Sequence, residues 1–293
     1  MSESKSRFHP YWKPLVAVVF WGGSFIATKH ALEEIKPLAI ILLRQILGIG
    51  LLTIIAIHQK KSFAINIKDH KWIFLLSGIA SLHLWIQVTG LQYTSASNTG
   101  WIIGITPVFM VLLALIFFKE SISPLQITGI AISFSGLLLL VSKGDLSSID
   151  LISNQGDLLV LLSSFTWAVY SLVGKKITIK YPPLMTILFL FVMMSLYLIP
   201  FTITGENISS VVSLSLTGWI SILFLGIFCS GIAYVLWAQA LSEMQTTKVG
   251  TFLYIEPFVT VFAAWILLNE QISFLTFVSG LIIIGGVILV NRK

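Results

Sequence analysis

The feature that most constrains this chain is a segment of about fifty residues that occurs twice. Residues 91–140 align with residues 241–290 at a constant offset of 150. Each copy has an apolar stretch interrupted by a proline, a polar turn with a glutamate, and a second apolar stretch. Identical residues at equivalent positions include Gly100 and Gly250, Pro107 and Pro257, Glu120 and Glu270, Ser123 and Ser273, and Gly136 and Gly286. This repeat predicts a fold with two related halves.

The composition predicts an integral membrane protein. Of the 293 residues, 56% are hydrophobic and 10% are charged, with a mean hydropathy of +0.95, whereas soluble domains are about one-quarter charged. The net charge of +6 comes from basic residues in short gaps between apolar stretches. That pattern is typical of membrane topology and argues against a nucleic-acid partner. The single cysteine, Cys229, excludes an intramolecular disulfide and offers no cysteine-based metal cluster.

The apolar stretches predict an all-α membrane protein with ten transmembrane helices. A helix needs about 20 apolar residues to cross the hydrocarbon core. On that basis the expected spans are 14–33, 37–57, 72–92, 97–118, 124–142, 156–175, 184–204, 217–241, 246–268 and 274–290. The gaps between them are too short for a second, soluble domain.

The repeat also extends to the front of each half. At an offset of 146, Trp21 aligns with Trp167, Lys29 with Lys175, and Pro37 with Pro183. Each half, 14–142 and 156–290, therefore holds five expected helices. An odd number makes the second copy enter the membrane from the opposite side, which predicts two inverted five-helix repeats with a substrate site between them near mid-membrane.

The basic residues predict the orientation of the chain. They gather in alternate gaps, for example at Lys60 and Lys61 and at Lys175 and Lys176, and near both ends of the chain. Because cytoplasmic loops carry the excess of Lys and Arg, we expect both termini in the cytoplasm. The polar first residues lead into the spans without a pattern typical of a cleavable signal peptide, so we expect them to form a retained tail.

Two charged residues, Arg44 and Glu256, fall inside expected spans. A charge in lipid costs roughly 3 kcal/mol or more, so both side chains should face protein or water. They could form a structural ion pair with each other. Alternatively, Glu256 could carry a coupling proton, for which burial favours the neutral form, or bind a substrate amine. The residues leave these roles open.

Other polar and aromatic residues form candidate cavity walls. They recur on single helical faces of several spans, and ordinary packing or an interfacial aromatic belt is the alternative interpretation. The candidates are Trp21, Ser24, His83, Gln87, Trp101, Trp167, Tyr170, Tyr234 and Trp237. No second ligand at metal spacing accompanies His83, so no metal site is expected.

The residues at the helix breaks suggest two further roles. Pro107 and Pro257 each remove a hydrogen bond within a span and are candidate hinges. Glu120 and Glu270 follow these spans on turns next to helix starts, which predicts that their carboxylates cap free backbone N–H groups.

At these residues the chain resembles the EamA-type transporters of the drug/metabolite transporter superfamily. The resemblance rests on the Trp21–Ser24 face, on Arg44, on Pro107 with Glu120, and on Tyr254–Pro257 with Glu270, and it extends over 14–290. It implies ten helices around a central cavity, alternating access, and export of amino acids or similar small metabolites from a bacterial cytoplasm across the inner membrane. It implies no organic cofactor.

Three functional classes compete. The inverted repeat, the proline breaks and the sparse intramembrane charges favour a secondary transporter of small metabolites. The aromatic faces favour apolar or aromatic amino acids as its cargo, and the resemblance implies export of amino acids or related compounds. The alternatives are a passive channel or a non-transporting membrane assembly partner. An intramembrane enzyme is disfavoured because Gly-x-Ser-x-Gly and His-Glu-x-x-His are absent. No ATP-binding loop occurs, so an ion gradient, with the proton as candidate ion, or the substrate's own gradient would supply the energy. No pattern specifies an oligomeric state.

Overall fold

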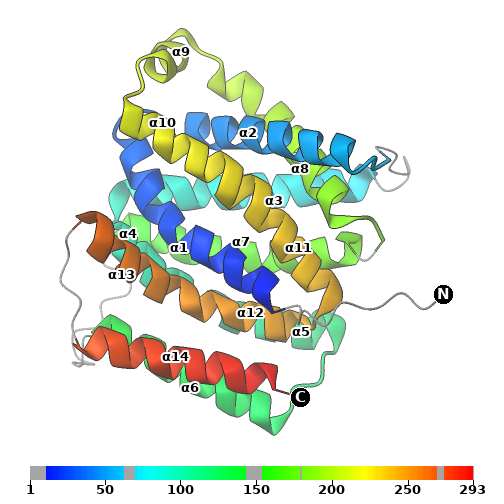
Figure 1. Ribbon diagram of the computed structural model, residues 1–293, viewed down its shortest axis with the longest axis vertical. Helices are drawn as coiled ribbons and strands as arrows, with labels where there is room; N and C mark the ends of the chain where they lie inside the picture. The colour runs from blue at the N-terminus through cyan, green and yellow to red at the C-terminus, as the bar shows by residue number, and fades with distance from the viewer. Residues whose placement is uncertain (1–10, 63–69, 143–153, 179, 269–273, 293) are drawn as a thin grey trace.

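The computed structural model describes residues 11–62, 70–142, 154–178, 180–268 and 274–292, and every regular element within these ranges is a helix (Figure 1). From here on, the first copy means residues 12–142 and the second copy means residues 155–291. The first contains α1 (Trp12–Leu32), α2 (Pro37–His58), α3 (His70–Tyr93), α4 (Ala96–Ile103), α5 (Thr106–Phe118) and α6 (Pro124–Ser142). The second contains α7 (Gln155–Thr178), α8 (Pro183–Thr202), α9 (Gly205–Val212), α10 (Leu216–Leu223), the π-helix η3 (Phe224–Ile232), α11 (Ala233–Glu243), α12 (Thr246–Gly250), the 3₁₀-helix η4 (Thr251–Tyr254), α13 (Ile255–Leu268) and α14 (Phe274–Asn291). The predicted all-α class is confirmed.

Eight helical segments in the described ranges are long and apolar enough to cross a membrane. Five are the single helices α1, α2, α3, α7 and α8. The other three are continuous runs of elements, namely α4 with α5, α10 with η3 and α11, and α12 with η4 and α13. The two remaining expected spans correspond to α6 and α14, which are apolar helices with shorter qualifying stretches. The chain is therefore a multi-pass membrane protein.

Helix starts are set by local sequence. Pro37 and Pro183 occupy the first positions of α2 and α8, where the missing N–H group costs nothing because it would have no partner within the helix. Ser95 and Ser215 accept hydrogen bonds from backbone N–H groups in the first turns of α4 and α10, at 3.0 Å each. These side chains satisfy donors that a helix start leaves open.

The helix breaks expected at the two prolines are present. In the first copy a turn at residues 104–105 separates α4 from α5, just before Pro107. In the second copy a 3₁₀ turn, η4, separates α12 from α13 just before Pro257. Both breaks follow from the hydrogen bond that proline cannot donate.

Contacts between the two copies occur in equivalent pairs. A Cβ atom added at Gly100 would lie 3.1 Å from Thr260 Oγ1, and one added at Gly250 would lie 3.2 Å from Met110 Sδ. The offset of 150 exchanges these two pairs. The neighbouring helices α6 and α14, side by side in Figure 1, repeat the pattern. Gly136 there contacts Ile283, and Gly286 contacts its equivalent partner, Ser133.

The two described ends of the chain meet at one end of the helix bundle. The Tyr11 hydroxyl donates to the Asn291 backbone carbonyl at 2.7 Å. Lys13 forms an ion pair with Glu243 at the end of α11. The start of α1, the end of α11 and the end of α14 therefore lie together (Figure 1).

Candidate functional site

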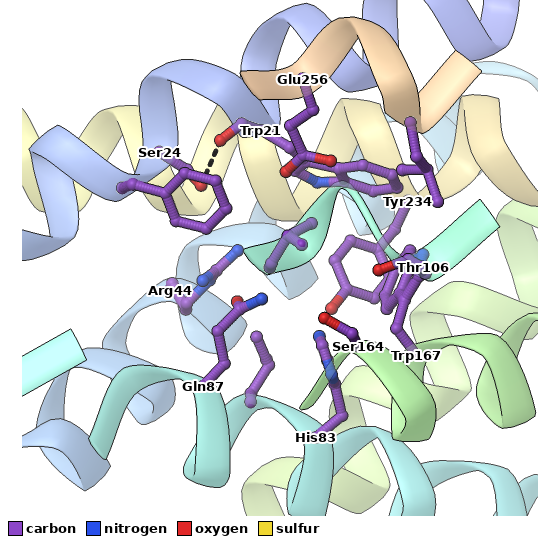
Figure 2. A pocket seen from close by; sticks show the side chains of 14 residues that line it. Trp21, Ser24, Arg44, His83, Gln87, Thr106, Ser164, Trp167, Tyr234 and Glu256 are labelled. Carbon is purple, nitrogen blue, oxygen red and sulfur yellow. Dashed lines mark hydrogen bonds between the residues drawn. The ribbon is translucent and has the colours of Figure 1, made fainter. Parts of the chain in front are cut away.

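A small cavity lies in the interior between the two copies. Its volume is about 30 Å³, enough for only one or two water molecules and too small for a metabolite. Helices from both copies supply its walls (Figure 2). The lining residues are Trp21, Ser24, Phe25, Arg44, His83, Leu84, Gln87, Ile103, Thr106, Ser164, Trp167, Tyr234, Leu253 and Glu256.

The structure brings most of the sequence-predicted wall residues together. Those that line the cavity are Trp21, Ser24, His83, Gln87, Trp167 and Tyr234, and both charged candidates, Arg44 and Glu256, join them. Tyr170 and Trp237 instead form a second layer behind the aromatic wall, and Trp101 packs against the core without lining the cavity.

The aromatic wall is built across the boundary between the copies. Trp21 and its repeat equivalent Trp167 meet edge to face, with ring centroids 4.9 Å apart. Tyr234 lies 5.5 Å from Trp167 and 5.8 Å from Trp21. Behind them, Tyr170 stacks on Trp167 at 4.9 Å and Trp237 lies 5.3 Å from Trp21. Each such pair contributes about 0.5–1.5 kcal/mol beyond its buried area, so these contacts stabilise the wall.

Arg44 is buried without a carboxylate partner in the described ranges. Its side chain is 4% exposed, and its Nε donates to Ser230 Oγ at 2.8 Å. The ion pairs within 4.0 Å in these ranges are Lys13–Glu243, His30–Glu33, Lys36–Glu206 and Lys175–Glu120. Arg44 and Glu256 therefore face the same cavity without forming the direct pair that one interpretation of the sequence required.

Glu256 enters the cavity from the first turn of α13, opposite the side occupied by Gln87 and His83 (Figure 2). It is 4% exposed. Thr106, its equivalent at the offset of 150, also precedes a proline and lines the cavity. The hydroxyl of Thr106 and the indole N–H of Trp167 are buried and have no hydrogen-bond partner in the described part of the chain. Both groups can therefore bind water or a ligand in the cavity.

His83 is held by the neighbouring helix α7. Its Nδ1 lies 3.0 Å from the Ser163 backbone carbonyl oxygen, which can only accept. Nδ1 must therefore carry the proton, and in the neutral imidazole Nε2 is left as an acceptor. The cavity thus combines one cationic group, one acidic group, and several neutral donors and acceptors with aromatic walls.

The EamA-like transporter family matches this chain over residues 12–142 and 154–292. The chain belongs to this family. An uncharacterized transporter of Archaeoglobus fulgidus is 32% identical over 282 residues, covering 95% of this chain and 96% of that protein. A probable amino-acid metabolite efflux pump of Escherichia coli is 24% identical over 295 residues, covering 93% and 91%. A solved crystal structure with 16% identity superposes with a TM-score of 0.77 and covers 98% of this chain and 97% of its own, which supports the fold alone.

Phe25, which shares the helical face of Trp21 and Ser24 expected to line a cavity, does line it, whereas five cavity residues of this EamA-like chain were not predicted from the sequence: Leu84, Ile103, Thr106, Ser164 and Leu253. Two of them had a usable signal. Thr106 is the repeat equivalent of Glu256, and Ser164 lies one helical turn before Trp167 on the same helix. The others are apolar residues in apolar helices, and nothing local distinguishes them from lipid-facing positions.

A second polar cluster joins the copies at the end of the bundle where the chain ends meet. Glu120 accepts hydrogen bonds from Lys175 Nζ at 3.0 Å and from the backbone N–H groups of Thr246 and Thr247 at 2.9 and 3.1 Å. Lys175 Nζ also donates to the Met244 carbonyl oxygen at 3.0 Å. Capping by Glu120 was expected, but the capped helix is α12 of the other copy rather than the next helix in sequence. Glu270 lies outside the described residues.

The hydrogen bonds to Glu120 control its ionisation. Burial by itself raises the pKa of this carboxyl group. The backbone N–H groups of Thr246 and Thr247 and the charge of Lys175 outweigh burial, and the pKa lies below its ordinary value. Glu120 is therefore ionised at neutral pH and pairs with Lys175 in a site where the side chains are only 10% and 13% exposed.

Proposed function

We propose that this EamA-like chain is a secondary transporter that exports amino acids or related small metabolites across the bacterial inner membrane. The observation that carries the proposal is that the buried guanidinium group of Arg44 and the buried carboxyl group of Glu256 face one cavity and do not touch each other. Burying either group in its charged form is costly. A substrate that carries both a carboxylate and an ammonium group would offset both costs at once.

The chemistry of the two groups assigns the ends of the substrate. The guanidinium group of Arg44 presents a planar set of donors that matches a carboxylate. The Glu256 carboxylate accepts hydrogen bonds from an ammonium group. A free amino acid carries both charges near neutral pH. The aromatic surface of Trp21, Trp167 and Tyr234 would cover an apolar or aromatic side chain.

Arg44 and Glu256 make the cavity asymmetric, whereas its aromatic walls are similar in the two copies. Trp21 and Trp167 are equivalent residues, so the two copies contribute similar aromatic surfaces. At the offset of 146, however, Arg44 corresponds to the buried, apolar Leu190. At the offset of 150, which applies to the later part of each copy, Glu256 corresponds to the neutral Thr106. The proposed substrate would therefore bind in one orientation, with its carboxylate toward α2 and its amine toward α13.

Alternating access is part of the proposal, because a cavity of about 30 Å³ must expand to admit an amino acid. We infer that residues 14–142 and 156–290 form two inverted five-helix repeats that move against each other. The contact between Gly100 and Thr260 has an equivalent in the contact between Gly250 and Met110, with the two copies in swapped roles. These paired contacts support this inference, since a two-fold relation makes contacts reciprocal. The breaks at Pro107 and Pro257 would serve as hinges.

Both termini are proposed to lie in the cytoplasm. We expect a thiol introduced at Lys61, just after α2, to be labelled by a membrane-impermeant reagent only after the cell is permeabilised. A thiol at Ser210 in α9 should react in intact cells. The native Cys229 is fully buried and provides a low background. Labelling of the Lys61 position from outside, with none at Ser210, would reverse the orientation.

A metabolite-efflux screen tests the proposed function. Cells that express this chain should release one or more amino acids faster than cells that lack it, and inverted vesicles should accumulate the same compound above its external concentration when a proton gradient is imposed. Flux that only equilibrates the compound would favour a passive channel. An unchanged profile across amino acids and related compounds would contradict the proposal.

A further inference from the structure

An unusual helical segment contacts two of the cavity-lining residues, Trp21 and Arg44, without lining the cavity itself. In the middle of the span Leu216–Glu243, nine residues form the π-helix η3 (Phe224–Ile232). Such π-helical insertions are rare and often lie at functional sites. Glycines let α2 pack closely on this segment, because a Cβ atom added at Gly226 or Gly231 would lie 2.5 or 2.7 Å from leucine side-chain atoms of α2.

Two consecutive residues of η3 hold two cavity residues that come from different helices. The carbonyl oxygen of Cys229 accepts a hydrogen bond from the indole N–H of Trp21 at 3.0 Å. Ser230 Oγ accepts from Arg44 Nε at 2.8 Å. Cys229 and Ser230 are fully buried, and neither lines the cavity. Their contacts therefore act on the site through Trp21 and Arg44.

The contact from Ser230 determines which edge of the guanidinium group remains available. Arg44 Nε is engaged, and no other hydrogen bond is formed by the guanidinium group in the described ranges. The two terminal nitrogens are thus left for a ligand. A carboxylate can bind these two nitrogens end-on in a bidentate arrangement. The hydrogen bond from Arg44 Nε to Ser230 Oγ restrains a long, flexible side chain, and such restraint lowers the entropic cost of binding a ligand.

We propose that Ser230, presented by the π-helix, is a positioning residue that orients Arg44 toward the carboxylate of the substrate. This inference rests on the proposed function, because it requires that Arg44 bind a carboxylate. It assigns a specificity role to a residue that does not touch the substrate. Loss of the Ser230 hydroxyl should weaken the binding of carboxylate-bearing compounds and leave compounds without a carboxylate unaffected.

The test uses the purified full-length chain in lipid nanodiscs and two probes, L-phenylalanine and 2-phenylethylamine, which is the same molecule without its carboxylate. Ser230→Ala should weaken L-phenylalanine binding by roughly tenfold to a hundredfold, the range expected for a hydrogen bond to a charged group. Binding of 2-phenylethylamine should change less than about threefold. Ser230→Thr, which keeps the hydroxyl, should restore most of the discrimination.

Ser195→Ala is the matched control, because Ser195 is a buried serine of α8 whose hydroxyl has no partner in the described ranges. It should leave both affinities unchanged. A double-mutant cycle covers the case in which Ser230→Thr does not fold: in an Arg44→Gln background, Ser230→Ala should cause no further loss.

The outcomes separate this inference from the proposed function. If the unmodified protein fails to bind L-phenylalanine or any other amino acid, the proposed function fails. If it binds and Ser230→Ala weakens both probes equally, or adds its full effect to Arg44→Gln, the positioning role is overturned while the proposed function stands.

Discussion

Replacement of Glu256 or Arg44 by glutamine should reduce the transport of a zwitterionic amino acid about a hundredfold or more. Each variant removes one charge and leaves the opposite end of the bound substrate buried without a charged partner. Truncating one member of a buried, hydrogen-bonded charge pair costs about 2–5 kcal/mol, and roughly 2.8 kcal/mol corresponds to a hundredfold. Initial rates of efflux from loaded vesicles provide the measurement.

The two variants should differ in what they still transport. Arg44→Gln should retain amines that lack a carboxylate, and Glu256→Gln should retain acids that lack an amine. Glu206→Gln is the control, since this glutamate lies in an exposed ion pair on the surface. Transport of all three compound types at the unmodified rate in both variants would remove the charges from the mechanism.

The same variants separate the other roles considered for Glu256. If it were an ion-pair partner of Arg44, Glu256→Gln would strand a buried positive charge and accumulate poorly in the membrane, and the double variant with Arg44→Gln would recover. The lack of contact within 4.0 Å leads us to expect no such recovery. If Glu256 carried a coupling proton, Glu256→Gln would keep exchange of substrate but lose accumulation driven by a pH gradient.

The charged cavity residues could be predicted because lipid penalises charge so strongly. Arg44 and Glu256 stand out in apolar stretches, and the cost of exposing them to lipid requires an interior position. The repeat supplied equally direct information about the helix breaks. Proline acts through local backbone chemistry, so Pro107 and Pro257 could be interpreted without knowing the packing.

The depth of each wall residue in the bundle could not be predicted. Tyr170 lies one helical turn after Trp167 and shares its face, but it stacks behind Trp167 instead of reaching the cavity. A helical face fixes a direction, whereas the neighbouring helices decide which residue along that face meets open space. The prediction that Trp101 lines the cavity was wrong for the same reason, since this side chain packs against the core of the bundle.

Features that depend on contacts between distant segments could not be predicted from the sequence either. The glycines of η3 are visible, but glycine alone does not distinguish a π-helix from close packing. Glu120 was correctly expected to cap a helix, yet its partner Thr246 lies more than a hundred residues away. Both cases are set by tertiary packing, which periodicity and local propensity do not encode.

Loss of the Glu120 carboxylate, which caps α12 and pairs with Lys175, should have a large effect on stability. Glu120→Gln should lower the free energy of unfolding by about 3 kcal/mol or more, because it leaves the largely enclosed Lys175 without its counter-charge. Thermal unfolding of the detergent-solubilised chain measures the loss. Adding Lys175→Met should recover part of it, since the double variant no longer buries an unpaired charge. Glu206→Gln, which breaks the exposed pair with Lys36, should cost less than about 1 kcal/mol.

The pH dependence of unfolding provides an independent check on the same contact. The pKa of Glu120 in the folded protein lies below its ordinary value of 4.5, so its contribution is fully present above the unfolded-state pKa. That contribution should stay constant from pH 7 to 5.5 and disappear as the pH falls below about 4.5 through the folded-state pKa. The stability difference between the unmodified chain and Glu120→Gln should therefore shrink on acidification. A difference that is absent at pH 7, or that grows as the pH falls, would show that the Glu120–Lys175 contact does not join the two copies.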